Sequence, residues 1–381
     1  MRIAIATDWF PPRQGGIEAQ LAALATRLAA RGHDVTVITS TPGASSGGGV
    51  DVRRIDGARL PGADLAISPR LPGVLRALLN EPFDVVHAHV SVMSPVGYLA
   101  AFAASARRTP TLVTFHSVLR IKRAVLALAN AVLRLNRSAI VWSAVSERVA
   151  GEVRGALGPI DVGVLPNGID LGFWRKADTD AGQSARPVTF VSAIRLQRKK
   201  RPHQLLRAFG RAVAESGPAR LVVAGSGPEL RALRASADAM NGHGAASVQL
   251  PGWRDAPGLK DLYRQADAFV LPTRHEAFGI AALEARAAGL PVFASRQAGC
   301  REFLRHDENA LLFGSDEDLA ALMARFIREP ALRQRLRAGD AMLERYDWNV
   351  VLAEHERLYE IAMRRRSPVP LAHASAAPAS R

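Results

Sequence analysis

Residues 266–292 constrain the fold more than any other part of the chain. Ala268–Leu271 has the length and apolar character of a buried parallel strand, and Pro272 ends it. After a polar turn, an alanine-rich segment from Gly279 predicts a helix that ends near Gly289, a residue suited to the position after a helix. A buried strand that leads through a turn into a helix is the building unit of a parallel α/β sheet.

Two carboxylates flank this strand-to-helix turn. Glu276 falls in the turn, and Glu284 falls about two turns into the helix on roughly the same side, because eight steps of ~100° overshoot two turns by only ~80°. Ligands of open α/β sheets bind outside the carboxyl ends of the strands, where a carboxylate can accept hydrogen bonds from sugar or ribose hydroxyls. The pattern alone fits a helix cap at Glu276 and a solvated Glu284 equally well.

The rest of the chain repeats the strand-turn-helix scheme. The N-terminal part of the chain predicts a βαβ unit, which crosses over into a parallel sheet. The unit consists of strand Ile3–Ala6, a turn at 8–16, a helix with apolar residues at offsets of four, seven and eleven, and strand Val35–Thr39. Helices are also expected at 202–216 and 259–265. Further strands are predicted at 85–87, 112–114, 140–145, 162–165, 188–192, 220–224, 248–250 and 292–294.

This repetition predicts two doubly wound domains that face each other across an interdomain cleft, a favoured place for ligands. We expect the first domain at 1–170, a linker at 171–186 and the second domain at 187–346. A final helix is predicted at 347–366. The Pro/Ala/Ser-rich tail at 367–381 is expected to be disordered.

Composition narrows the partners and the compartment. The net charge of +15 favours anionic partners, but the basic residues are dispersed and only 6% of the chain is aromatic, which disfavours a nucleic-acid binder. The only cysteine, Cys300, cannot form an internal disulfide, which fits a reducing compartment. We see no signal peptide and no apolar run long enough to span a membrane, so a cytoplasmic location is expected.

Cations, glycines and a histidine lie at other strand ends. Arg195 and Lys200 follow the strand at 188–192, and Arg195 comes too soon after the strand to be read as surface charge alone. Gly15 and Gly16 lie between the first strand and the first helix, where backbone N–H groups and the helix dipole attract anions. His116 ends a strand and can hydrogen-bond a sugar hydroxyl or exchange a proton near neutral pH.

Together these motifs resemble those of the retaining, nucleotide-sugar-dependent glycosyltransferases of family 4, also called group 1, which have the two-Rossmann GT-B architecture. The resemblance runs from Arg2 to about Tyr359 and includes an E-x7-E motif, an R-x4-K element and a PNG[VI]D loop at 166–170. The chain departs from the family pattern at Ala277 and Ile194, where glycine is usual.

The resemblance implies roles for individual residues. Arg195 and Lys200 would stabilise the leaving diphosphate, Glu276 would orient the donor sugar, and His116 would line the sugar site, so these four are the candidate catalytic residues. The donor would be a UDP- or GDP-sugar. Further substrate contacts are expected from Gly15, Gly16, Asn167, Gly225, Gly227, Phe278, Gly279 and Glu284.

The expected reaction is the retaining transfer of a hexosyl unit to a hydroxyl acceptor, a lipid or a glycan. A sugar-nucleotide epimerase or hydrolase on the same fold is the alternative, and a nucleic-acid binder is a weaker one. No obligatory cofactor or metal is expected. The D-x-D at Asp178–Asp180 lies in the predicted linker, and His87 and His89, which share one strand face, lack an evident third ligand.

The segment Val118–Ser138 carries five basic residues and no acidic one. Its apolar residues fit one helix, and cationic amphipathic helices dock on anionic lipid. The same pattern fits a helix that faces the core and has basic ends. The first interpretation predicts a peripheral enzyme on the inner face of a membrane.

Overall fold

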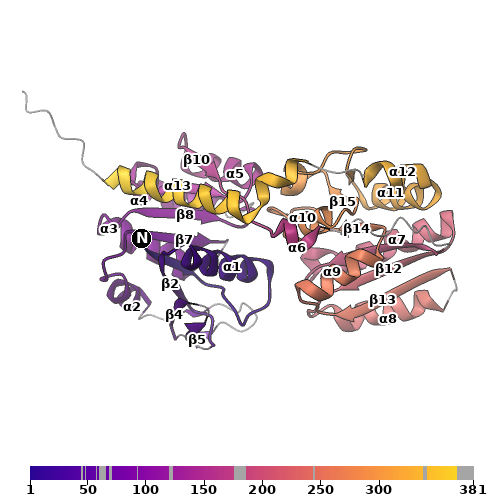
Figure 1. Ribbon diagram of the computed structural model, residues 1–381, viewed down its shortest axis with the longest axis horizontal. Helices are drawn as coiled ribbons and strands as arrows, with labels where there is room; N and C mark the ends of the chain where they lie inside the picture. The colour runs from indigo at the N-terminus through magenta and orange to yellow at the C-terminus, as the bar shows by residue number, and fades with distance from the viewer. Residues whose placement is uncertain are drawn as a thin grey trace, which may run out of the picture.

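The computed structural model describes residues 1–43, 46–47, 49–56, 58–59, 66–67, 71–91, 93–119, 123–175, 186–242, 245–337 and 341–366. Two α/β halves lie side by side, each built on its own sheet (Figure 1). The predicted fold class, two Rossmann-like parallel-sheet halves, is confirmed. Most of the predicted linker at 171–186 and the whole predicted tail at 367–381 lie outside the described residues.

The first half contains an eight-stranded sheet in the order β10-β9-β8-β7-β1-β2-β4-β3, in which only β3 pairs antiparallel. Its central strands are buried almost throughout, as parallel strands covered by helices must be. The strands are β1 (Arg2–Thr7), β2 (Asp34–Thr39), β3 (Ser46–Gly47), β4 (Val50–Arg54), β7 (Val85–Val90), β8 (Thr111–Phe115), β9 (Val141–Ala144) and β10 (Val162–Val164).

Helices cover both faces of this sheet and connect its strands. A separate short pair, β5 (Ala58–Arg59) and β6 (Ala66–Ile67), lies outside it. The helices are α1 (Gly16–Ala30), α2 (Leu71–Leu78), α3 (Pro95–Ala106), α4 (Arg123–Leu133) and α5 (Glu147–Leu157). A short helix, α6 (Leu171–Trp174), follows them and packs on the second half, where the centroid of the Trp174 ring lies 5.6 Å from that of Tyr263. The buried residues of α6 show that the predicted linker begins with a packed helix.

The second half has six parallel strands in the order β13-β12-β11-β14-β15-β16. They are β11 (Val188–Ala193), β12 (Ala219–Ala224), β13 (Ala246–Gly252), β14 (Ala268–Leu271), β15 (Val292–Ser295) and β16 (Ala310–Phe313). Their helices are α7 (Pro202–Ser216), α8 (Leu230–Asn241), α9 (Ala256–Gln265), α10 (Ile280–Ala287), α11 (Asp316–Arg328) and α12 (Pro330–Leu336).

The strand order reverses between β11 and β14 in the second sheet and between β1 and β7 in the first. Such switch points are where open α/β sheets bind ligands, because the loops on either side diverge there. The sequence analysis missed β4 and β16. Strand β16 has four apolar residues, the same length as the predicted β14, so the length of an apolar run does not by itself decide whether the run forms a strand.

The last helix, α13 (Trp348–Arg366), returns from the second half and lies along the first sheet (Figure 1). It contacts β7, β8, β9 and α1, and its buried residues Trp348 and Tyr359 belong to the core of the first half. This helix therefore links the second half to the strands that end at the first switch point.

Candidate functional site

Two predicted catalytic residues form an ion pair at the switch point of the second sheet. Lys200 closes a short 3-10 turn (Arg198–Lys200) after β11, and Glu276 lies in the turn after the neighbouring β14. The Lys200 Nζ donates to Glu276 Oε2 at 2.7 Å. Only 27% of the lysine side chain and 16% of the glutamate side chain are exposed, so solvent screens the pair weakly.

Arg195 crosses from the second half to the first. Its Nη2 donates to the backbone carbonyl of Gln14 and lies 3.8 Å from Glu18 Oε1. A Cβ added to Gly16 would lie 3.3 Å from the Ile280 side chain of α10. The turn between β1 and α1 and the loop after β11 therefore meet at one place.

Glu18 is a site residue that the motifs did not reveal. It is only 4% exposed, and it accepts a hydrogen bond from Arg13 at 2.8 Å in addition to its contact with Arg195. A Cβ on Gly15 would lie 2.1 Å from its Oε2, so the carboxylate folds back over the glycine at the start of α1. One buried anion thus lies between two arginines at a helix N-terminus.

Gly225 and Gly227 have a structural function. Their φ angles are +148° and +150°, and a Cβ on either would lie 1.9 Å from the Ile194 carbonyl oxygen or 2.4 Å from that of Leu196. Leu196 N also donates to the Ser226 carbonyl at 2.8 Å. The two glycines therefore let the loop after β12 support the segment that carries Arg195.

Glu284 is half-buried in α10 and has no ion-pair partner among the described residues. Burial raises its pKa to about 8. A solvated helix carboxylate would not be perturbed in this way, so the alternative of a fully solvated Glu284 is wrong. With this pKa the Glu284 carboxyl is mostly protonated at pH 7, so without a ligand it offers an acceptor oxygen and an O–H donor to ligand hydroxyls.

One predicted contact needs correction. The Phe278 side chain is only 2% exposed, and its ring centroid lies 5.7 Å from those of Phe303 and Tyr346, so it packs in the core and cannot line a sugar site. The backbone bends sharply after it, because Gly279 has a φ of +93° directly before α10. Asn167 is 7% exposed and lines a small cavity in the first half.

A hydrogen bond from the first half fixes the turn that carries Glu276. Ser146 Oγ donates to the Ala277 carbonyl at 2.6 Å, and it also accepts from Val149 N at the start of α5. From the other side, Gly299 N donates to the Glu276 carbonyl at 2.9 Å. The backbone around Glu276 is thus held from the first half by Ser146 and from within the second half by Gly299.

His116, at the end of β8, belongs to a group of buried histidines. Its Nε2 lies 2.9 Å from Nδ1 of His89, which ends β7. Burial lowers the pKa of His116 to about 3, so its ring is neutral at pH 7. The expectation that His116 exchanges a proton near neutral pH is therefore wrong, whereas a hydrogen bond to a sugar hydroxyl remains available.

Other cationic and potential ligand side chains near the site have partners within the protein. Arg201, next to Lys200, has a φ of +62° and forms a partly buried ion pair with Asp316. His87 hydrogen-bonds Tyr359 and Thr114 through its two ring nitrogens. Within the described part of the chain no group of three or more potential ligands could hold a metal, and the D-x-D at Asp178–Asp180 lies outside it.

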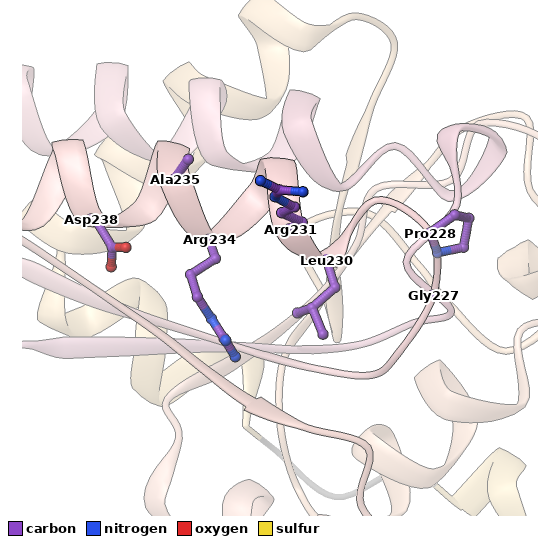
Figure 2. A pocket seen from close by; sticks show the side chains of 7 residues that line it. All are labelled: Gly227, Pro228, Leu230, Arg231, Arg234, Ala235 and Asp238. Carbon is purple, nitrogen blue, oxygen red and sulfur yellow. The ribbon is translucent and has the colours of Figure 1, made fainter.

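A cavity of about 510 Å³ lies on the second half, beside the N-terminal part of α8 (Figure 2). Of the predicted site residues only Gly227 lines it, together with Arg231, Arg234 and Asp238, whose side chains are exposed on α8. The cavity contains none of the residues proposed for catalysis, so its size does not identify it as the place of reaction.

Two protein families and several full-length relatives match this chain in sequence. The family model "Glycosyl transferases group 1" matches residues 176–340, and "Glycosyltransferase Family 4" matches residues 14–173. A D-inositol 3-phosphate glycosyltransferase of Thermobispora bispora is 30% identical over 92% of this chain and 91% of its own. A phosphatidyl-myo-inositol mannosyltransferase of Mycobacterium leprae is also 30% identical, over 98% of this chain and 100% of its own.

Solved structures support the fold. HepE of Anabaena, crystallised with UDP and glucose, has a TM-score of 0.74 at 18% identity and covers 94% of this chain and 99% of its own. Sucrose-phosphate synthase of Thermosynechococcus elongatus has a TM-score of 0.75 at 20% identity and covers 94% of this chain and 98% of its own. The two family models and the full-length relatives show that this chain belongs to the group 1, family 4 glycosyltransferases.

Proposed function

We propose that this glycosyltransferase moves a hexosyl unit from a nucleotide diphosphate sugar, a UDP- or GDP-sugar, to a hydroxyl of an inositol-phosphate-type acceptor, with retention of anomeric configuration. The acceptor class rests on the inositol phosphate and phosphatidylinositol enzymes among its relatives. A bound UDP in a protein of the same fold agrees with the donor class.

The pair between Lys200 and Glu276 carries the proposal. As the glycosidic bond of the donor breaks, negative charge grows on the leaving diphosphate, and a cation fixed nearby stabilises that charge more in the transition state than in the ground state. Lys200 supplies this cation, and Glu276, 2.7 Å from its Nζ, accepts hydrogen bonds from the sugar. Arg195 adds a second cation from the adjacent loop.

The neighbouring groups extend the donor site in both directions. The N-terminus of α1 at Gly16 offers backbone N–H groups and a favourable dipole to phosphate oxygens. On the other side, the unpaired carboxylate of Glu284 accepts hydrogen bonds from the ribose. His116 lines the sugar site from the first half.

Retention is proposed to follow a front-face course. In that course the leaving phosphate accepts the proton of the acceptor hydroxyl while the new bond forms on the same face of the sugar. In this course Glu276 orients the sugar by accepting hydrogen bonds, and no covalent bond forms between the sugar and the protein. Neutral His116 likewise acts by hydrogen bonding.

A membrane-facing surface is proposed on α4. One side of this helix packs on α5 through Leu126, but Val125, Leu128 and Val132 are 65%, 67% and 72% exposed. The exposed basic residues Arg123, Arg134 and Arg137 flank this aliphatic surface. Exposed apolar side chains among cations fit an anionic lipid surface, and an enzyme with a lipid acceptor works there.

This placement makes the protein a peripheral enzyme on the cytoplasmic face of a membrane. None of the helices in the described part of the chain is both long and apolar enough to pass through a bilayer. The attraction of the surface on α4 is electrostatic as well as apolar, so salt is expected to weaken it.

The test begins with thermal shifts in a panel of UDP-, GDP- and ADP-sugars, followed by transfer assays with inositol phosphates and phosphatidylinositol. Lys200→Ala should lower turnover by roughly two to three orders of magnitude, the cost of losing one stabilising group in the transition state. Lys199→Ala is the matched control, because this neighbouring lysine is exposed and is not part of the proposed site.

The anomeric configuration of the product, measured by NMR, tests retention. Consumption of the donor without any acceptor would instead indicate the epimerase or hydrolase alternative. Equal turnover of Lys200→Ala and Lys199→Ala would contradict the assigned site. Binding of duplex DNA or RNA without any response to sugar nucleotides would contradict the enzyme's proposed donor class.

A further inference from the structure

The ring of His116 is held by a second histidine that belongs to none of the recognised motifs. His116 follows β8 and His89 lies in the neighbouring β7, where it pairs in register with Thr114. The 2.9 Å contact joins His89 Nδ1 to His116 Nε2. The nitrogen of His116 that points inward is therefore occupied, and only Nδ1 is left to meet a substrate.

The ring of His89 cannot turn away from this contact. It is 4% exposed, and its centroid lies 3.8 Å from that of His87. His87 is itself fixed at both nitrogens, with 2.9 Å to the Tyr359 hydroxyl and 2.7 Å to Thr114 Oγ1. A chain of contacts thus runs from α13 through two neighbouring histidine rings, tilted by 38° to each other, to the candidate sugar site.

Both members of the contact are neutral. Burial lowers the pKa of His89 and His116 far below neutral pH, and the neighbouring histidines add to the effect. A neutral imidazole has one N–H donor and one acceptor nitrogen. The single proton between His89 and His116 therefore decides whether Nδ1 of His116 is a donor or an acceptor.

We propose that His89 is a positioning residue for the glycosyl transfer: it fixes the ring orientation and the tautomer of His116, and so determines which hydrogen bond Nδ1 offers to the sugar. This inference rests on the proposed role of His116 in the sugar site. Among the described residues no group hydrogen-bonds Nδ1 of His116, and this atom is not among the buried unpaired nitrogens, so it is open to a ligand.

The decisive comparison is between His89→Leu and His89→Asn. The two side chains have the same branched arrangement of heavy atoms, but only asparagine places a polar atom where Nδ1 of His89 was. Without that hydrogen bond the ring of His116 can rotate and can take either tautomer. We expect His89→Leu to lower kcat about tenfold to a hundredfold with little change in donor KM, because a displaced reacting group costs turnover, and His89→Asn to restore most of it.

A spectroscopic measurement needs no substrate. In ¹⁵N-histidine-labelled protein, long-range ¹H–¹⁵N spectra distinguish the two tautomers, and the signal lost in His116→Gln identifies His116. The wild-type protein should show a single tautomer of His116, whereas His89→Leu should show a mixture. His89→Asn should keep one dominant tautomer.

A mixture of tautomers in the wild-type protein would overturn the proposal, even if His89→Leu does not fold. Equal losses of kcat in the leucine and asparagine variants would also overturn it. Absence of transferase activity in the wild-type protein is a different outcome: it counts against the proposed function, while the tautomer spectra still test the contact between the two histidines.

Discussion

Replacing Glu284 by glutamine separates two effects of its charge, the loss of folding stability on burial and the contribution to nucleotide binding. Burial raises the pKa of this carboxyl from 4.5 to about 8 in the folded protein. In the unfolded chain the pKa returns to its ordinary value, so between these two pH values the folded state holds the proton more tightly. The free energy of unfolding therefore falls as the pH rises from 4.5 to 8, and the loss is complete above pH 8.

The difference between 4.5 and about 8 corresponds to about 5 kcal/mol, at ~1.4 kcal/mol for each pH unit. Solvent reaches part of the Glu284 side chain and screens its charge, so we expect about half of this, ~2 kcal/mol. Glutamine has the same shape and does not ionise. For a chain of this size the gain amounts to a rise in Tm of roughly 2 to 3 °C above pH 8, and to almost none near pH 4.5.

Thermal unfolding at pH 4.5 and pH 8.5, with and without the nucleotide found in the donor panel, measures both effects. Without ligand, Glu284→Gln should melt at a higher temperature than wild type at pH 8.5. It should nevertheless bind the nucleotide about tenfold more weakly, because the amide group has one oxygen fewer than the carboxyl group to accept hydrogen bonds from the ribose. Glu360→Gln, on the exposed end of α13, is the control and should change neither. A Glu284→Gln gain that is equal at both pH values would refute the electrostatic reasoning, and unchanged nucleotide affinity would refute the ribose contact.

Three further changes test other parts of the site. Ser146→Ala should cost about 1 kcal/mol of stability by removing the cap of α5, and it should also lower turnover. Ser315→Ala removes a similar cap from α11 and should lower stability alone in the same melting and activity assays. Gly225→Ala should lower the Tm and the donor affinity together, because its Cβ would collide with the carbonyl oxygen behind Arg195; a fully stable variant with normal donor affinity would contradict the close contact. Serine at the three exposed aliphatic positions of α4 should reduce co-sedimentation with anionic liposomes, and unchanged sedimentation would eliminate the proposed membrane surface.

The sequence was sufficient to locate the candidate residues whose place in the fold follows from their position after a strand. Arg195, Lys200 and Glu276 lie in the loops directly after β11 and β14, and Glu284 lies in α10, the helix that follows β14. Parallel strands bring the segments that follow them to the same edge of a sheet. Apolar runs located these strands, so the positions of the four residues at the switch point followed from local pattern and a general rule of topology. The missed strand β16 did not affect them, because it lies at the far edge of the sheet.

Residues whose role depends on a partner distant in sequence could not be assigned this way. Glu18 looked like an ordinary acid in the first turn of a helix, and its two arginine partners come from different loops. His89 meets His116 across two strands, 27 residues apart. Phe278 lies inside a recognised motif, yet the left-handed turn at Gly279 directs it into the core. A motif gives the position of a residue but not the direction of its side chain.

The ion pairs of the site also bear on how a donor is bound. In the unliganded protein each proposed phosphate-binding cation already has an anionic neighbour: Lys200 has Glu276, and Arg195 has Glu18. A diphosphate therefore exchanges with carboxylates rather than meeting bare cations, and the net binding energy is the small difference between two strong attractions. The exchange has a useful consequence, because a Glu276 carboxylate released from Lys200 is free to accept hydrogen bonds from the sugar. Binding of the diphosphate and orientation of the sugar are in this way coupled through one lysine.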